Sequence, residues 1–114
     1  MVRIEDTVEL LNLKILNKGR SFKVKTGFTC DLLSVVMAKA SKDSVWITVQ
    51  RHLNTVAVAT LREIGAIVIS HGFIPDEEVI DRAKKERIWI LTTEEPSFEI
   101  SGKLYRLLRN ETNS

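Results

Sequence analysis

Three short apolar segments constrain the fold of this chain more than any other feature. They occupy residues 45–49, 66–69 and 88–91 and are rich in Val, Ile and Trp. A strand with one face in water alternates apolar and polar residues, and these segments do not alternate cleanly. The pattern predicts parallel strands that are covered on both faces of one sheet.

A helical pattern follows each of these strands. The first has apolar residues at helical spacing over 53–64, and Gly65 is placed to end it in the left-handed conformation. The second begins with the acids 76–78 and ends near the lysines 84–85, as the helix macrodipole favours. The third starts near residue 97 and carries one apolar stripe. Because such alternation produces right-handed crossovers, the sequence predicts a three-layer α/β/α domain with a mostly parallel central sheet.

The segment before residue 45 contributes smaller elements. The sequence predicts a short helix over 4–11, two short strands at 13–16 and 22–26, and a helix over 31–40. The chain has 114 residues and shows no linker, repeat or low-complexity segment. We therefore expect residues 1–114 to form a single domain.

Composition and charge narrow the class of protein. The 17 basic and 15 acidic residues leave a net charge of +2, which does not call for a nucleic-acid partner. Cys30 is the only cysteine, which excludes an internal disulfide framework and favours a reducing compartment. No apolar run approaches the roughly 18 residues of a membrane span, and acids occupy the place of a basic signal-peptide start. We expect a cytoplasmic protein without a membrane partner.

Candidate site residues cluster where the predicted strands end. In open parallel sheets, ligands bind beyond the carboxyl ends of the strands, where loops lead into helices. The sequence places both histidines in these loops, and a small anion or nucleotide-like ligand is one interpretation of them. The other is that the loop residues only brace their own turns, with Arg51 paired to Glu94 or Glu95. The candidate ligand-binding residues are Arg51, His52, Ser70, His71, Gly72 and Thr93.

Cys30 is the one candidate nucleophile outside that set. It precedes a predicted helix, whose N-terminus can activate a thiol, but Asp31 beside it opposes this. Val36 stands where a tyrosine phosphatase has its arginine, and Leu33 stands where a redox motif has its second cysteine. A zinc site built from Cys30 and the two histidines would lack short local ligand spacing. We expect a core cysteine, no metal, no cofactor and no catalytic residue.

Extra apolar residues on the predicted helices suggest a second subunit. Leu33 and Met37 widen the apolar surface of one helix, and Val58 does so on the next. A short chain gains by burying such surface against a copy of itself. The sequence therefore predicts a homodimer that uses these three residues.

Several segments resemble the DRTGG domain family. Residues 43–48 resemble its Gly-Asp-apolar-apolar-Ile-Thr strand, and Arg51 falls at its arginine. Residues 70–79 match its Thr-Gly-Gly segment, which leads through Pro-Asp-Glu-Glu into a helix. Two departures are that Ser70 and His71 replace the Thr and the first Gly, and that Arg87-Ile88-Trp89 replaces a usual Gly-Ile-Pro. The resemblance covers nearly the whole chain.

The resemblance implies a fold like the N-terminal domain of HPr kinase/phosphorylase. It also implies a regulatory or ligand-sensing module, often dimeric, and it supplies no catalytic residue. Two hypotheses therefore stand. The first is a non-enzymatic regulatory module that binds a small anionic or nucleotide-like ligand or a partner protein. The alternative is a small enzyme or carrier that uses Cys30 or a histidine of the strand-end loops.

Overall fold

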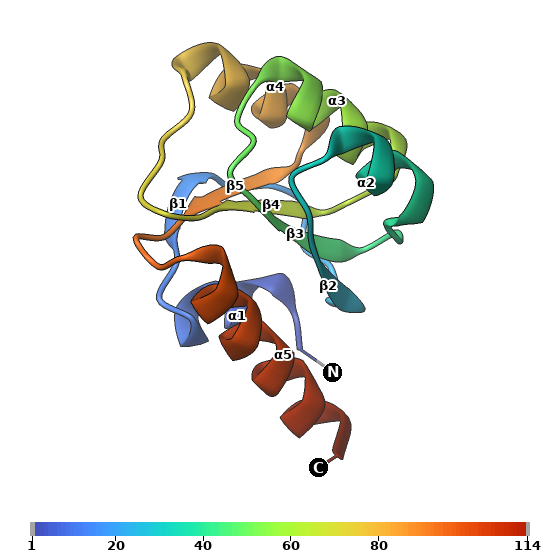
Figure 1. The fold of residues 1–114 in the computed structure, drawn as a ribbon, viewed down its shortest axis with the longest axis vertical. Coiled ribbons are helices and arrows are strands. Elements are labelled where there is room, and N and C mark those ends of the chain that lie inside the picture. The colour runs from blue at the N-terminus through green and yellow to red at the C-terminus, as the bar shows by residue number, and fades with distance from the viewer. Residues whose placement is uncertain (1, 114) are drawn as a thin grey trace.

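A five-stranded sheet forms the middle layer of the molecule (Figure 1). The computed structural model describes residues 2–113, and the side chains of residues 2–110. The elements in chain order are α1 (Ile4–Leu10), β1 (Lys14–Asn17), β2 (Thr26–Thr29), α2 (Leu33–Lys39), β3 (Ser44–Thr48), α3 (Leu53–Leu61), β4 (Ala66–Ile69), α4 (Glu77–Glu86), β5 (Trp89–Thr92) and α5 (Ser97–Asn113).

The strand order is β1-β5-β4-β3-β2, and four of the five strands are parallel. Val45 is aligned with Ala66, and Ala66 with Trp89, so the three predicted strands form the centre of the sheet in register. Only β1 runs the other way, with Lys14 opposite Thr92. The predicted parallel pairing of these three strands is confirmed.

Alternate side chains of the central strands enter two separate cores. Val45, Val68 and Leu91 join the core under α1 and α5. Trp46 and Ile67 join the core under α2, α3 and α4. The ribbon shows these two helix groups on opposite sides of the sheet (Figure 1). Every residue of β3, β4 and β5 is buried, which explains why their sequences do not alternate, and the three-layer α/β/α prediction is confirmed.

The N-terminal strands differ from the predicted positions. β2 spans Thr26–Thr29, whereas the sequence predicted a strand at 22–26. Phe22 and Val24 are buried in the core beneath α1, and only a single bridge joins Lys23 to Arg3. The apolar alternation at 22–24 therefore reflects burial of a loop, since hydrophobic periodicity alone does not distinguish such a loop from a strand.

Two predicted details are wrong for steric reasons. Glu63, with φ 56°, takes the left-handed conformation after α3, and Gly65 does not. A glycine is needed at position 65 because any side chain there would overlap the buried ring of Phe22. Val58, expected at a subunit interface, is buried within the chain's own α3 layer. Leu33 also packs partly on this core, whereas Met37 is exposed.

Candidate functional site

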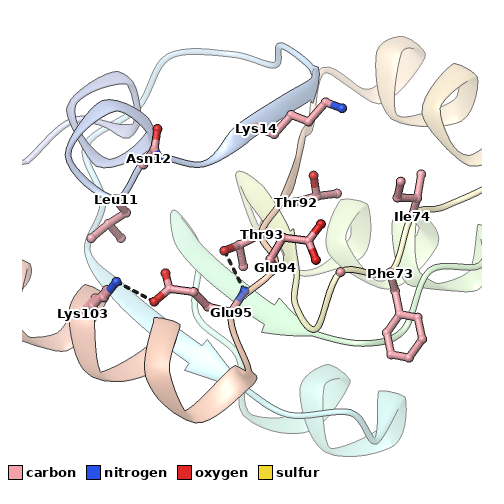
Figure 2. A pocket seen from close by; sticks show the side chains of 11 residues that line it. Leu11, Asn12, Lys14, Phe73, Ile74, Thr92, Thr93, Glu94, Glu95 and Lys103 are labelled. Carbon is pink, nitrogen blue, oxygen red and sulfur yellow. Dashed lines mark hydrogen bonds and ion pairs between the residues drawn. The ribbon is translucent and has the colours of Figure 1, made fainter.

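The loops at the carboxyl ends of β4 and β5 enclose a cleft together with the loop between α1 and β1. The antiparallel direction of β1 brings its start to this end of the sheet, beside the end of β5. The cleft has a volume of about 420 Å³. It is lined by the backbone of Gly72 and by ten residues labelled in Figure 2: Leu11, Asn12, Lys14, Phe73, Ile74, Thr92, Thr93, Glu94, Glu95 and Lys103.

The loop after β4 has an unusual backbone. His71 and Gly72 are both left-handed, with φ 61° and 76°. Their N–H groups donate to the carbonyl oxygens of Glu95 (2.8 Å) and Thr93 (2.9 Å). A side chain at Gly72 would also meet the Glu94 carboxylate. A histidine in this conformation is strained, and the two hydrogen bonds to the next loop hold it there.

The His71 ring caps the last helix. Its Nε2 accepts a hydrogen bond of 3.0 Å from the N–H of Ser97, the first residue of α5. Such a bond requires a neutral ring with its proton on Nδ1. Next to it, the buried Ser70 hydroxyl bonds the Ser97 hydroxyl at 2.6 Å. His71 and Ser70 thus fix the position of α5 relative to the strand ends.

Arg51 approaches the same loop from the β3 side. Its guanidinium donates to the Val49 carbonyl oxygen at 2.9 Å and stacks over the ring of Phe73, 4.3 Å from the centroid. Within the described residues, Arg51 forms no ion pair with Glu94 or Glu95, and Glu95 pairs with Lys103 instead. The alternative in which Arg51 is neutralised across the loops is therefore wrong.

The remaining two candidates belong to different turns. His52 precedes α3, and its N–H donates to the Thr55 hydroxyl at 3.2 Å. The Thr93 hydroxyl accepts from the N–H of Glu95 at 3.2 Å and lines the cleft. Of the six predicted site residues, only Gly72 and Thr93 line the cleft together. Arg51 and His52 do not line the cleft, although Arg51 stacks on Phe73, which does.

Among the charged residues of the cleft, the sequence reasoning missed Lys14 and considered Glu94 only as an ion-pair partner of Arg51. Lys14 is exposed, lines the cleft and forms no ion pair among the described residues. Glu94 covers Gly72 with its carboxylate. Lys14 begins the edge strand β1, and only the antiparallel pairing of β1 with β5 brings it to this end of the sheet.

Cys30 directly follows β2, at the edge of the sheet opposite β1. Its thiol is half-buried against the core beneath α2, and its nearest polar contact is the Leu32 carbonyl oxygen at 3.7 Å. Its own carbonyl oxygen accepts from the Trp46 ring at 2.8 Å. Among the side chains of residues 2–110, no three of His, Cys, Asp or Glu come close enough together to hold a metal ion. None of the described helices is long and apolar enough to cross a membrane.

Comparisons with known proteins bear on this architecture. The family model described as HPr Serine kinase N terminus matches residues 48–108, just over half of the chain. The fold is also similar to a crystal structure of the CBS and DRTGG domains of the regulatory region of Clostridium perfringens pyrophosphatase, complexed with the activator diadenosine tetraphosphate. The TM-score is 0.71 at 20% identity, over 89% of this chain and 44% of that one, so this chain spans less than half of that structure. No curated protein matches the sequence.

Proposed function

Because this chain is a DRTGG-like domain and belongs to the HPr Serine kinase N terminus family, we propose that it is a non-enzymatic regulatory module that binds a small anionic or nucleotide-like ligand. The ligand would occupy the cleft at the carboxyl ends of β4 and β5. The pyrophosphatase region with a similar fold is complexed with a nucleotide activator, which agrees with this ligand class.

The strained loop after β4 is the observation that carries the proposal. Backbone strain persists only where the surroundings enforce it, and it concentrates at ligand sites. Here the left-handed His71–Gly72 pair turns the chain so that Gly72 and Phe73 line the cleft. Three hydrogen bonds join this pair to residues 93–97, so the cleft wall is fixed before a ligand arrives. A preformed wall lowers the entropy cost of binding.

The chemistry of the cleft suits an anion flanked by a flat group. Lys14 offers an ammonium group that forms no ion pair within the described part of the chain, and Thr93 offers a hydroxyl that can still donate. Beside them, Phe73 is 42% exposed, and the Arg51 guanidinium stacks on its ring. Arginine and aromatic faces stack on nucleobases, while lysine attracts phosphate. Glu94 opposes an anion and would restrict binding to ligands that avoid its carboxylate.

Calorimetric titration with ADP and with pyrophosphate tests the proposal. Lys14→Ala should weaken binding of both ligands by about tenfold, because it removes a charge-assisted contact. Glu94→Gln should strengthen binding by about threefold or more, because it removes a like charge from the cleft. Lys85→Ala, at the far end of α4, is the matched control and should leave the affinity unchanged.

Two results would overturn the proposal. One is the absence of binding to either ligand at millimolar concentration. The other is binding that Lys14→Ala and Glu94→Gln leave unchanged, which would place the ligand elsewhere. Stronger binding of ADP than of pyrophosphate, lost in Phe73→Ala, would support stacking of the base on this ring.

A further inference from the structure

The outer face of α5 exposes large apolar side chains that the chain itself does not cover. Phe98 is 84% exposed and Tyr105 is 65% exposed. They are seven residues apart, so they lie on one face of the helix, opposite the buried Ile100 and Leu104. Figure 1 shows the C-terminal half of α5 extending beyond the rest of the fold. Exposed aromatic residues aligned in this way are typical of an interaction surface.

Gly102 lies between these two aromatic residues. A Cβ atom at this position would meet nothing within 4 Å, so no contact inside the chain requires a glycine here. Glycine is also a poor helix former, and α5 has 17 residues without a break. Two hollows lie beside Gly102, of about 640 Å³ towards α1 and about 350 Å³ towards β2. Phe98 and Gly102 line both hollows.

Two charged residues beside this face are placed so that they could pair between two copies related by a two-fold axis. Glu99 and Arg106 both line the hollow towards α1, two helical turns apart, and neither forms an ion pair among the described residues. When two identical helices cross antiparallel about a two-fold axis, the same flank of each meets the other. Glu99 of each copy then faces Arg106 of the other. In a parallel two-fold pair the opposite flanks meet, so Glu99 would not face Arg106 of the other copy.

The geometry points to a second copy of this chain as the occupant of the α5 face, docked antiparallel with Gly102 at the crossing point. The absent side chain lets the two helices approach closely. Phe98 of one copy would enter a hollow beside Tyr105 of the other, where the hollow towards β2 is bordered by Gly27 and Ser101. This interface does not involve the ligand cleft and differs from the predicted one on Leu33, Met37 and Val58.

Analytical sedimentation at about 100 μM tests this interface with variants that reverse the charge of Glu99 or of Arg106. Like charges placed across an interface weaken association by about tenfold or more. Wild type should be a dimer, and Glu99→Arg and Arg106→Glu should each be monomers. An equal mixture of these two variants should dimerise, because each repelled pair then becomes an attractive one. Lys84→Glu, on α4 across the sheet, is the control for net charge and should stay dimeric.

A second variant separates docking from folding. Gly102→Leu adds a side chain where the chain has open space and improves helix propensity, so its Tm should equal or exceed that of wild type at a concentration where both are monomeric. The bulk at the crossing point should nevertheless abolish the dimer. A monomeric wild type, a dimer that survives Gly102→Leu, or single charge variants that fail to pair in the mixture would each overturn the proposed interface.

Discussion

Two arginines, each stacked on a phenylalanine, distinguish the two ends of the sheet. At the amino ends of the strands, Arg20 lies over Phe22, donates to Asp43 at 2.8 Å and also reaches the Glu63 carbonyl oxygen. At the carboxyl ends, Arg51 lies over Phe73 and donates only to a carbonyl oxygen two residues before it. Phe22 is 4% exposed and Phe73 is 42% exposed.

The two ends of the sheet differ in how far their polar groups are used in hydrogen bonds within the chain. At the amino ends, the Arg20 carbonyl oxygen also accepts from the Trp89 ring at 2.6 Å, so side chain and backbone are both engaged. At the carboxyl ends, the backbone is bonded but the Lys14 side chain and the Phe73 ring remain accessible. We infer that the amino end stabilises the fold and that the carboxyl end is available to a ligand.

Gly19→Ala should have the largest effect on stability and should act only at the amino end. The new Cβ would lie 2.5 Å from the Arg87 carbonyl oxygen and 2.5 Å from the Trp89 nitrogen, and neither backbone atom can move freely. We expect a loss of about 3 kcal/mol in the free energy of unfolding, measured by urea denaturation. Gly102→Ala, compared at a concentration where the protein is monomeric, is the control, since its Cβ meets open space and should raise stability slightly. A loss below about 0.5 kcal/mol for Gly19→Ala would show that this end is not rigidly packed.

The two arginines should respond differently to the same substitution. Arg20→Ala leaves the half-buried Asp43 carboxylate without its partner and should cost about 1–2 kcal/mol of stability. Arg51→Ala breaks no ion pair and should cost less than about 0.5 kcal/mol. It should, however, abolish the rise in Tm that ADP produces, while Arg20→Ala should keep that rise. Equal loss of stability in both variants would contradict the distinction between the two ends.

His71→Ala probes the connection between the cleft wall and α5. It removes the Nε2 acceptor for the Ser97 N–H and keeps a strained left-handed residue. Loss of a helix cap costs about 1 kcal/mol, which denaturation of the variant would measure. His71→Asn keeps a residue that tolerates this conformation and should recover part of the loss. If His71→Ala leaves stability unchanged, the ring does not cap α5 in solution.

The smallest expected effect concerns Glu5. The Ser21 hydroxyl, which donates to the Glu5 carboxylate at 3.0 Å, lowers the pKa of Glu5 below its ordinary value of 4.5. Because the folded pKa is the lower one, the stabilisation is present above about pH 4.5 and is lost as the pH falls through the folded pKa. Acid titration of Ser21→Ala should show a weaker fall in stability below that pH. An unchanged acid titration would show that this bond contributes nothing.

The sequence predicted the central architecture because a strand that is buried on both faces is apolar along its whole length. The segments at 45–49, 66–69 and 88–91 have this pattern, and all three form buried parallel strands. The position of β2 could not be predicted, because the buried Phe22 and Val24 mimic a strand while lying in a loop. Local patterns report burial and do not report which partner covers a residue.

The site was less accessible to sequence reasoning for a related reason. Loop positions correctly placed Gly72 and Thr93 at the carboxyl ends, where they line the cleft. Ser70 and His71 form their hydrogen bonds with Ser97 of α5, which lies 27 and 26 residues further along the chain. Lys14 reaches the cleft only because β1 pairs with β5. None of these long-range contacts has a signature in one sequence.

A titration of the ¹⁵N-labelled protein with ADP, followed by amide chemical shifts, shows whether the ligand binds at the carboxyl end of the sheet. We expect progressive shifts at Lys14, Gly72, Phe73 and Thr93, and unchanged amides at Arg20 and Asp43. Both ends of the sheet are observed in the same sample, so each serves as the reference for the other. Shifts confined to Arg20 and Asp43, or no shift at any of these residues, would contradict this expectation.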